Sequence, residues 1–305
     1  MFAEYFAIFT WNESVQLPEW GERAIMPMKI LGKDILAPNI ARFVIEAPLI
    51  AKKARPGQFV VVRHSEKGER IPLTIADYDA DRGTIVLICQ GVGKSTREIN
   101  RLGTGDVFLD IMGPLGTPCP IREGGTVVCV AGGLGAAPLY PKIKALHRAG
   151  CRVITLLGAQ RAELLILKEE LAAVSAEVRC STDDGSYGQK GFVTQLLREV
   201  LQKEQVDEII AVGPVPMMAA AVQVAEEFHV PVLVSLNALM IDGTGMCGGC
   251  RVTVGGKTKF CCVDGPTFDG SAVDFKELTK RLSFYRREEE LVDHSCRIGL
   301  GRGES

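Results

Sequence analysis

The stretch Thr126-Val-Val-Cys-Val-Ala-Gly-Gly-Leu-Gly-Ala-Ala-Pro138 decides the fold of this chain. Its apolar first part predicts a buried strand over Thr126–Val130. The glycines that follow allow a tight turn, and the uncharged residues after them predict a helix over Ala137–Ala149. A strand, a glycine-rich turn and a helix form the first part of a βαβ unit, which is the building block of a parallel sheet. We therefore expect an α/β domain around this stretch.

Strands and helices continue to alternate after this stretch, as in a parallel sheet with right-handed crossovers. The further predicted strands are Arg152–Leu157, Glu177–Cys180, Glu208–Val212 and Pro231–Val234. The predicted helices lie near Ala162–Val174, Thr194–Gln202 and Met217–Glu227, and a charged C-terminal helix is expected over Phe275–His294.

The loops after these strands form the candidate NAD(P) site, because open parallel sheets bind nucleotides at the carboxyl ends of their strands. The turn departs from the G-x-G-x-x-G pattern, since Pro138 stands where the third glycine would be. No acid directly follows Leu157 to bind a ribose 2′-hydroxyl, and Arg161 can meet a 2′-phosphate, so the residues leave NAD and NADP both open. The candidate residues are Gly132, Gly133, Gly135, Ala136, Pro138, Gly158, Arg161, Asp183, Asp184, Gly213, Pro214 and Met217.

The preceding segment has the texture of an antiparallel β-barrel. Short runs rich in Val, Ile, Leu and Phe are separated by turn pairs such as Pro56-Gly57 and Arg82-Gly83. The runs are Ala41–Ala47, Gln58–His64, Arg70–Ala76 and Thr84–Gln90, and a short helix, Ser95–Leu102, follows them.

Two segments of this barrel suit a flavin nucleotide when they are taken together. Arg70-Ile-Pro72-Leu73-Thr74 offers a guanidinium for a pyrophosphate and a hydroxyl that can hydrogen-bond a flavin ring edge. Gly91-Val-Gly93-Lys94-Ser95-Thr96 opens the short helix, whose first backbone N–H groups favour a phosphate. Singly, an arginine and a threonine on a strand are more often solvated surface residues.

The most specific pattern is Asp242-Gly-Thr-Gly-Met-Cys247-Gly-Gly-Cys250, with Cys262 eleven residues further on. Plant-type [2Fe–2S] ferredoxins ligate their cluster with C-x4-C-x2-C and a distant fourth cysteine, and this chain has that spacing with an aspartate in first place. The predicted ligands are therefore Asp242, Cys247, Cys250 and Cys262. Cys261 competes for the fourth place, but neighbouring side chains point apart, so only one fits. Structural zinc on Cys247, Cys250 and two further ligands is the alternative.

Composition excludes other classes of protein. Lys+Arg 35 against Asp+Glu 37 leaves a net charge of −2, which is not the footprint of a nucleic-acid binder. Hydrophobic residues at 47% and charged residues at 24% exclude a disordered chain, and 305 residues suggest about two domains. The uncharged runs Gly124–Pro141 and Ile209–Ala225 contain glycine and proline, which favours strand–turn–helix units over membrane spans. No signal peptide is visible, so we expect a cytoplasmic protein.

With these segments in this order, the chain resembles the ferredoxin–NADP⁺ reductase superfamily, and within it the electron-transfer subunits that contain FAD, NAD and a [2Fe–2S] cluster. The resemblance covers about Met28–His294 and is closest to the small subunits of NADH-dependent reduced ferredoxin:NADP⁺ oxidoreductases, also known as sulfide dehydrogenase subunits. It rests on Met240–Cys247, Cys262–Pro266 and Ser181–Gly188. Those subunits hold their cluster with one Asp and three Cys. The similar dihydroorotate dehydrogenase B subunits have Cys in first place, so Asp242 argues against that type.

The resemblance implies an oxidoreductase subunit that takes a hydride from NADH onto FAD, near Thr74, and passes single electrons to the cluster. It also implies a heterodimer with a larger flavin and iron–sulfur subunit that handles NADP(H) and ferredoxin, with electron bifurcation as a property of the whole complex. The alternatives are an electron-transfer subunit of a dihydroorotate dehydrogenase or hydrogenase, and a zinc-stabilised nucleotide-binding module without enzyme activity. No catalytic triad or dyad can be assembled from the sequence.

The expected organisation has five parts. An extension over residues 1–26, with Trp11 and Trp20, is expected to pack on the partner. The remaining parts are the FAD barrel over 27–120, the NAD(P) domain over 121–235, the [2Fe–2S] loop over 236–270, and a helix and tail over 271–305.

Overall fold

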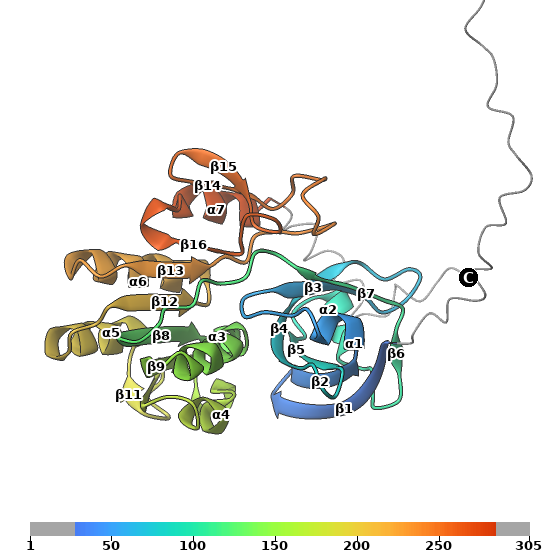
Figure 1. The fold of residues 1–305 in the computed structure, drawn as a ribbon, viewed down its shortest axis with the longest axis horizontal. Helices are drawn as coiled ribbons and strands as arrows, with labels where there is room; N and C mark the ends of the chain where they lie inside the picture. The colour runs from blue at the N-terminus through green and yellow to red at the C-terminus, as the bar shows by residue number, and fades with distance from the viewer. Residues whose placement is uncertain (1–27, 285–305) are drawn as a thin grey trace, which may run out of the picture.

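The computed structural model describes residues 28–284, which form two sheets side by side and a small hairpin beyond the second sheet (Figure 1). The first sheet is antiparallel throughout, in the order β6-β1-β2-β5-β4-β3-β7. Its strands are β1 (Met28–Ala37), β2 (Ile40–Glu46), β3 (Phe59–Arg63), β4 (Ile71–Asp79), β5 (Thr84–Gln90), β6 (Val107–Phe108) and β7 (Asp110–Leu115). Two short helices, α1 (Pro48–Ala51) and α2 (Lys94–Ile99), accompany it.

The interior of this nearly closed barrel follows the period of two that a strand imposes. Phe43 and Ile45 on β2, and Ile85 and Leu87 on β5, are fully buried, and they belong to one apolar cluster that fills the barrel. The predicted antiparallel barrel is therefore confirmed.

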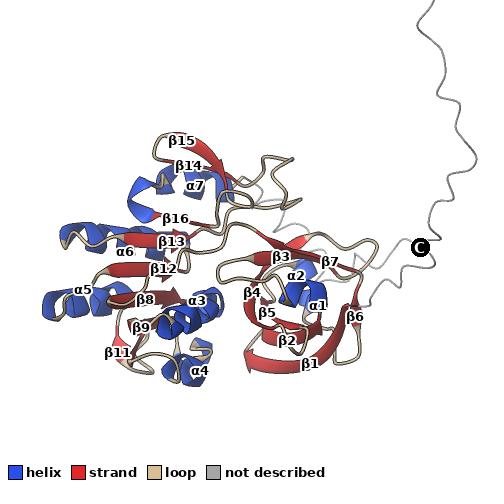
Figure 2. Cartoon of the chain, in the orientation of Figure 1, coloured by secondary structure: helices blue, strands red, loops and turns tan. Residues whose placement is uncertain are grey.

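The second sheet has the order β11-β10-β9-β8-β12-β13-β16 and is parallel except for its last pair. Its strands are β8 (Thr126–Gly132), β9 (Arg152–Ala159), β10 (Glu177–Thr182), β11 (Gln189–Lys190), β12 (Glu208–Val212), β13 (Val232–Ser235) and β16 (Thr267–Asp269). Helices α3 (Ala136–Arg148) and α4 (Lys168–Ala172) pack on one face, and α5 (Val193–Lys203) and α6 (Val215–Glu227) pack on the other (Figure 2). The predicted α/β domain is confirmed.

The order of this sheet creates a crevice for a ligand. From β8 the chain builds outward to β9 and β10, and then it returns to the other side of β8 with β12 and β13. The loops after β8 and β12 therefore leave the sheet in opposite directions. Open α/β sheets bind ligands at such a switch point, outside the carboxyl ends of the strands.

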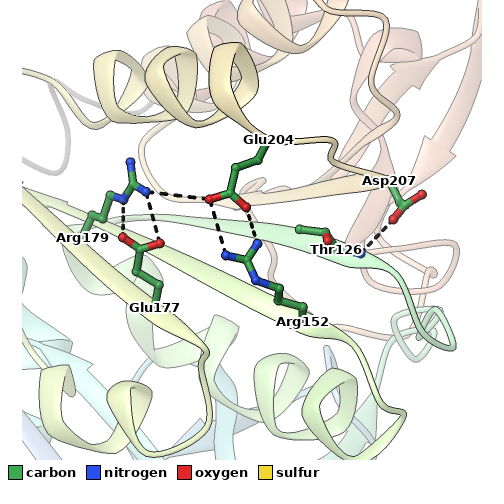
Figure 3. A network of polar contacts seen from close by, with 6 residues as sticks. All are labelled: Thr126, Arg152, Glu177, Arg179, Glu204 and Asp207. Atoms are coloured by element: carbon green, nitrogen blue, oxygen red, sulfur yellow. Dashed lines mark hydrogen bonds and ion pairs between the residues drawn. The ribbon is translucent and has the colours of Figure 1, made fainter.

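A polar network closes the opposite end of the sheet, at the amino ends of the strands. Its members are Thr126, Arg152, Glu177, Arg179, Glu204 and Asp207 (Figure 3). Glu204 accepts from Arg152 and also lies 4.0 Å from a guanidinium nitrogen of Arg179. Such partly exposed pairs contribute little stability each, and they lie at the end of the sheet away from the nucleotide crevice.

The cysteine segment is attached to the second sheet. Strands β14 (Arg251–Val254) and β15 (Lys257–Phe260) form a hairpin, and β16 then pairs antiparallel with β13, with Ser235 opposite Thr267. Helix α7 (Phe275–Leu282) packs near β14 and α6. The cysteine loop is thus held by the sheet that also carries the nucleotide crevice.

Ion pairs join the barrel to the second sheet. The ammonium of Lys144 on α3 lies 2.7 Å from the carboxylate of Asp77 on β4, and Arg42 on β2 lies 3.0 Å from Glu170 on α4. The first pair joins β4 to α3, and the second joins β2 to α4. Residues of β4 and α3 also line the cavity described below.

The structure also differs from the sequence predictions. The helix predicted over Ala162–Val174 is a short 3-10 turn over Ala162–Leu164 followed by α4, because Leu167 between them has a left-handed φ of 57°. The C-terminal helix ends at Leu282 and is followed by a turn at Ser283 and Phe284, so it is shorter than the predicted Phe275–His294. The rest of that predicted range lies outside the described residues. The extension over residues 1–26 lies outside them as well. The predicted domain boundaries stay predictions. Within residues 28–284, no helix has the length and apolar character that a membrane span requires.

Candidate functional site

A cavity of about 930 Å³ lies between the barrel and the carboxyl ends of the second sheet. The barrel contributes Pro72, Leu73 and Thr74 of β4 to its lining. From the second sheet it receives the predicted residues Gly132, Gly133, Gly135, Pro138, Gly158, Asp183, Gly213, Pro214 and Met217. The structure thus brings the core of both predicted binding segments to one hollow.

Other predicted residues lie outside this lining. They are Arg70, Gly91, Gly93, Lys94, Ser95, Thr96, Ala136, Arg161 and Asp184. Ala136 is buried in the first turn of α3 and packs in the core. Arg70 directly precedes β4, and the residues from Gly91 to Thr96 lead from β5 into α2, so both segments adjoin lining residues without lining the cavity themselves.

The glycine turn after β8 brings helix α3 very close to strand β12. A Cβ atom on Gly135 would lie 2.0 Å from the carbonyl oxygen of Val212, so only glycine fits there. Pro138 lies in the first turn of α3, where the N–H group that it lacks would have no intrahelical partner. The departure from G-x-G-x-x-G therefore leaves the helix start intact.

The loops after β9 and β10 are tied together beside the crevice. Arg161 pairs with Glu163 at 2.5 Å between Nε and Oε1. Asp184 accepts from both the backbone N–H and the hydroxyl of Ser186, which holds the pKa of that carboxyl below its usual range, and the Ser186 hydroxyl accepts from the backbone N–H of Ala162. Glu163 was not among the predicted site residues, and its carboxylate competes with any phosphate for the guanidinium of Arg161.

Glu69, the neighbour of Arg70 in the sequence, contacts the start of α2. The Ser95 hydroxyl donates to the Glu69 carboxylate, and the hydroxyl of Thr96 accepts from the backbone N–H groups of Val92 and Gly93 at 3.0 Å each. A carboxylate therefore already lies at this helix start, as an anionic group would. Among the described residues, no hydrogen bond or ion pair engages the Arg70 guanidinium, which is exposed next to it.

The cysteine loop brings Cys250 and Cys262 together. Their Sγ atoms are 3.1 Å apart, both side chains are buried, and the backbone N–H of Cys262 points at the sulfur of Cys250 at 3.4 Å. Burial, and then the neighbouring Cys250, raise the pKa of Cys262 to about 12. The metal-free thiol is therefore protonated at neutral pH, and binding of a metal would release the proton.

Asp242 and Cys247 form a second pair on the exposed side of the loop. The Asp242 carboxylate accepts from the backbone N–H of Thr244 at 3.0 Å and from that of Cys247 at 2.9 Å, and these bonds lower the pKa of Asp242. Another backbone N–H, that of Gly249, points at the sulfur of Cys247 at 3.4 Å. The carboxylate is thus ionised and held next to a cysteine.

The four predicted ligands suit two metal ions better than one. No three of the donor side chains within residues 28–284 converge as they would around a single ion. They fall instead into the pairs Asp242 with Cys247 and Cys250 with Cys262, and each iron of a [2Fe–2S] centre needs two protein ligands besides its two sulfides. Cys261 is fully buried in the apolar cluster of the second sheet, and burial raises the pKa of its thiol, so it behaves as a core residue.

Several cavity residues were missed by the sequence analysis, chiefly Phe59, Gln90, Lys142, Ser235 and Asn237. Lys142 had a detectable signal, because it falls on the apolar face of α3 with Leu139 and Leu146 at helical spacing. Phe59, Gln90 and Ser235 lie at strand ends and Asn237 lies in the loop after β13, and none of them belongs to a sequence pattern.

The barrel, the switch-point crevice and the cavity between them define a two-domain oxidoreductase of the ferredoxin reductase class. Two family models match the chain. An oxidoreductase NAD-binding domain matches residues 129–223, and the iron–sulfur cluster binding domain of dihydroorotate dehydrogenase B matches residues 237–274.

Whole-chain comparisons place the protein more closely. A dihydroorotate dehydrogenase B electron transfer subunit homolog from Thermotoga maritima is 48% identical, over 86% of this chain and 93% of the relative. A solved structure of NADH-dependent reduced ferredoxin-NADP oxidoreductase, described for flavin-based electron bifurcation, is 46% identical with a TM-score of 0.85, over 89% of this chain and 98% of that chain. A ferredoxin NADP⁺ reductase from Neisseria gonorrhoeae, at 17% identity and a TM-score of 0.55 over 66% of this chain and 89% of that one, shares the fold alone. This chain belongs to the family of electron-transfer subunits that the first two represent, and the predicted resemblance is confirmed.

Proposed function

We propose that this chain takes a hydride from NADH onto FAD and passes the electrons one at a time to a [2Fe–2S] cluster and a larger partner subunit. The observation that carries the proposal is the shared cavity, because β4 of the barrel and the loops of the nucleotide crevice line the same hollow. The cysteine loop is attached to β13, whose last residue, Ser235, lines that hollow too. A flavin is suited to this place because it accepts two electrons and releases them singly.

The test is a rapid-mixing experiment with protein reconstituted with FAD, iron and sulfide. NADH is expected to bleach the flavin absorbance first and the cluster absorbance afterwards. A protein that binds both groups but leaves the cluster oxidised with excess NADH would refute the proposed order of transfer.

The residues that fit FAD are Arg70, the backbone groups of Gly91–Thr96, and Pro72–Thr74 at the cavity. We expect Arg70→Ala to weaken FAD binding about tenfold to a hundredfold, because a charge-assisted contact worth about 1.5–3 kcal/mol is lost. The measurement is flavin retained against dilution, followed by fluorescence. Arg101→Ala, an exposed arginine beyond the end of α2, is the control and should bind FAD normally. Full occupancy in diluted Arg70→Ala would remove Arg70 from the site.

NAD(H) fits the crevice formed by Gly132–Pro138, Gly158, Asp183, Asp184 and Gly213–Met217. We assign a preference of the crevice for NAD(H) over NADP(H) to Glu163, because its carboxylate pairs with the Arg161 guanidinium that a 2′-phosphate would need. Glu163→Gln should improve kcat/KM for NADPH relative to NADH about twofold to fivefold, since exposed ion pairs are worth up to about 1 kcal/mol. Glu169→Gln, which removes a carboxylate paired with Lys168 elsewhere on the surface, is the matched control. An unchanged ratio of kcat/KM for NADPH to that for NADH in Glu163→Gln would exclude Glu163 as the source of the preference.

The cluster is assigned to Asp242, Cys247, Cys250 and Cys262, in the two pairs described above. Thiolates suit iron because they are soft, electron-rich ligands, and backbone N–H groups directed at sulfur stabilise the charge that a cluster gains on reduction. Zinc is less well supported, because no three donors within residues 28–284 converge on one point.

The larger subunit is expected to dock over the cluster loop. Around the ligands, Met246 is 88% exposed, Ile241 54% and Val263 48%, which is unusual for apolar side chains so close together in sequence and supports a covered surface. Handling of NADP(H) and ferredoxin, and bifurcation, would belong to the complex. The second candidate is a dihydroorotate dehydrogenase partner, which the family model over residues 237–274 favours. Identification of the subunit that co-purifies with the native chain separates the two.

A further inference from the structure

Lys142 is a fully buried cation in the wall of the cavity. Its exposed fraction is 0%, and its neighbours on α3, Leu139, Ile143 and Leu146, are core residues. Lysine is almost never fully buried without a charged partner. Together with Ser235, Lys142 nevertheless contributes to the lining of the cavity.

The partners of Lys142 are neutral. Its Nζ donates to the hydroxyl of Ser235 and, at 3.2 Å, to that of Thr267. Within residues 28–284, no carboxylate forms an ion pair with it. The titratable groups that face it are the thiols of Cys119 and Cys129, and burial raises the pKa of Cys129, so that this thiol is uncharged at neutral pH.

A purely structural role does not require a lysine here. The hydroxyls of Ser235 and Thr267 lie 3.0 Å apart and hydrogen-bond each other, so both would remain satisfied without the ammonium. An ammonium has three N–H donors, and two of them are used. Burial lowers the pKa of Lys142 from its ordinary value of 10.5. Next to the cavity, the fold therefore either buries the charged ammonium of Lys142 without a counter-charge or loses stability by deprotonating it.

We propose that Lys142, acting with Ser235, balances the negative charge that the flavin in this cavity gains on reduction. The inference rests on the proposed function. A hydride that moves from a dihydronicotinamide to a neutral isoalloxazine ring carries two electrons and one proton, so a C–H bond breaks, an N–H bond forms, and the ring gains one negative charge. The nicotinamide becomes oxidised, and no further reactant is consumed.

The charge of Lys142 and the reduction of the flavin are linked in both directions. If the ammonium favours the reduced ring by a given factor, reduction favours the ammonium by the same factor. The pKa of Lys142 is therefore low with oxidised flavin and rises on reduction. Between these two pKa values, reduction takes up a second proton, so its equilibrium constant should fall about a hundredfold per pH unit instead of about tenfold.

The test compares Lys142→Met with Lys144→Met in protein reconstituted with FAD, by spectroelectrochemical titration of the flavin. Lys144 is two residues away on the same helix, but it is paired with Asp77 and does not line the cavity. Lys142→Met should disfavour reduction at least tenfold, which is a fall of about 30 mV for a two-electron couple. Lys144→Met should change the equilibrium less than twofold. Equal shifts of the flavin reduction potential in both variants, or no shift in Lys142→Met, would overturn the proposal.

A second readout needs no flavin. Below the pKa of Lys142, the buried ammonium lowers the free energy of unfolding. This loss of stability becomes smaller as the pH rises from the lowered pKa towards 10.5. Flavin-free Lys142→Met should therefore unfold at or above the melting temperature of the wild type at pH 7. Marked destabilisation would show a structural role and would contradict the proposal.

Two further arms keep the test decisive. Lys142→Gln replaces the methionine variant if that one does not fold, and it should disfavour reduction as well. In some interval below pH 10.5, the equilibrium constant for flavin reduction should fall more steeply with pH in the wild type than in the Lys142 variants. A tenfold fall per pH unit throughout in the wild type would refute the linkage. Wild type that fails to bind FAD would refute the proposed function, whereas normal binding with unaltered potentials would refute only the role of Lys142.

Discussion

Cys250→Ala is expected to lose its iron and its inorganic sulfide. Cys250 is buried, and its sulfur lies 3.1 Å from that of Cys262, so it supplies one of the two thiols of that pair. The loss of one thiolate leaves one iron with a single protein ligand. Iron and sulfide content, together with low-temperature EPR of the reduced protein, are the measurements.

Two variants of neighbouring residues serve as controls for this prediction. Cys261→Ala should keep full iron content, because its thiol is buried in the apolar cluster of the second sheet. Asp242→Cys should keep the cluster but change its spectrum and potential, because a carboxylate oxygen is a harder and less covalent donor than a thiolate. An unchanged EPR signal in Asp242→Cys would exclude the aspartate as a ligand. Loss of iron from Cys261→Ala would mean that the wrong neighbour had been chosen.

Gly135→Ala is expected to lower the free energy of unfolding by about 3 kcal/mol or more. Most small-to-large substitutions cost less, because they push against side chains, whereas this one meets backbone atoms. The added Cβ would lie 2.0 Å from the Val212 carbonyl oxygen, so α3 and β12 would have to move apart. The melting temperature should fall by about 6–12 °C. The same movement opens the crevice, so KM for NADH should rise.

Gly133→Ala is the matched control in the same turn. A Cβ atom at Gly133 meets nothing within 4 Å, and only its left-handed φ of 54° is strained, which costs about 1 kcal/mol. Thermal unfolding of both variants, followed by circular dichroism, separates steric contact from backbone strain. Equal losses in the two variants would show that the close approach of α3 to β12 is not what Gly135 permits.

Local sequence patterns were sufficient for the two sheets and for their helices. The alternation that buries Phe43 and Ile45 sets a strand of the barrel, and the run Thr126–Val130 with its glycine turn sets the first βα unit. Short strands without a pattern, such as β6 and β16, were not predicted, because they form only when a partner strand is already in place. The broken helix near Leu167 was missed for a related reason, since a single left-handed residue leaves no mark in the hydrophobic period.

The sequence by itself determined the chemistry that this protein can hold. The spacing of Asp242, Cys247, Cys250 and Cys262, and the glycines of the turn after β8, are local features, because one loop and one turn contain most of the atoms involved. Only the tertiary structure decided how these parts meet. It pairs Cys250 with Cys262 across a hairpin, joins Thr74 and Gly213 in one cavity, and buries Lys142 against Ser235 and Thr267, more than ninety positions along the chain. Contacts between distant segments depend on how sheets and helices pack, and a sequence pattern records the buried face of each element but not the element that covers it.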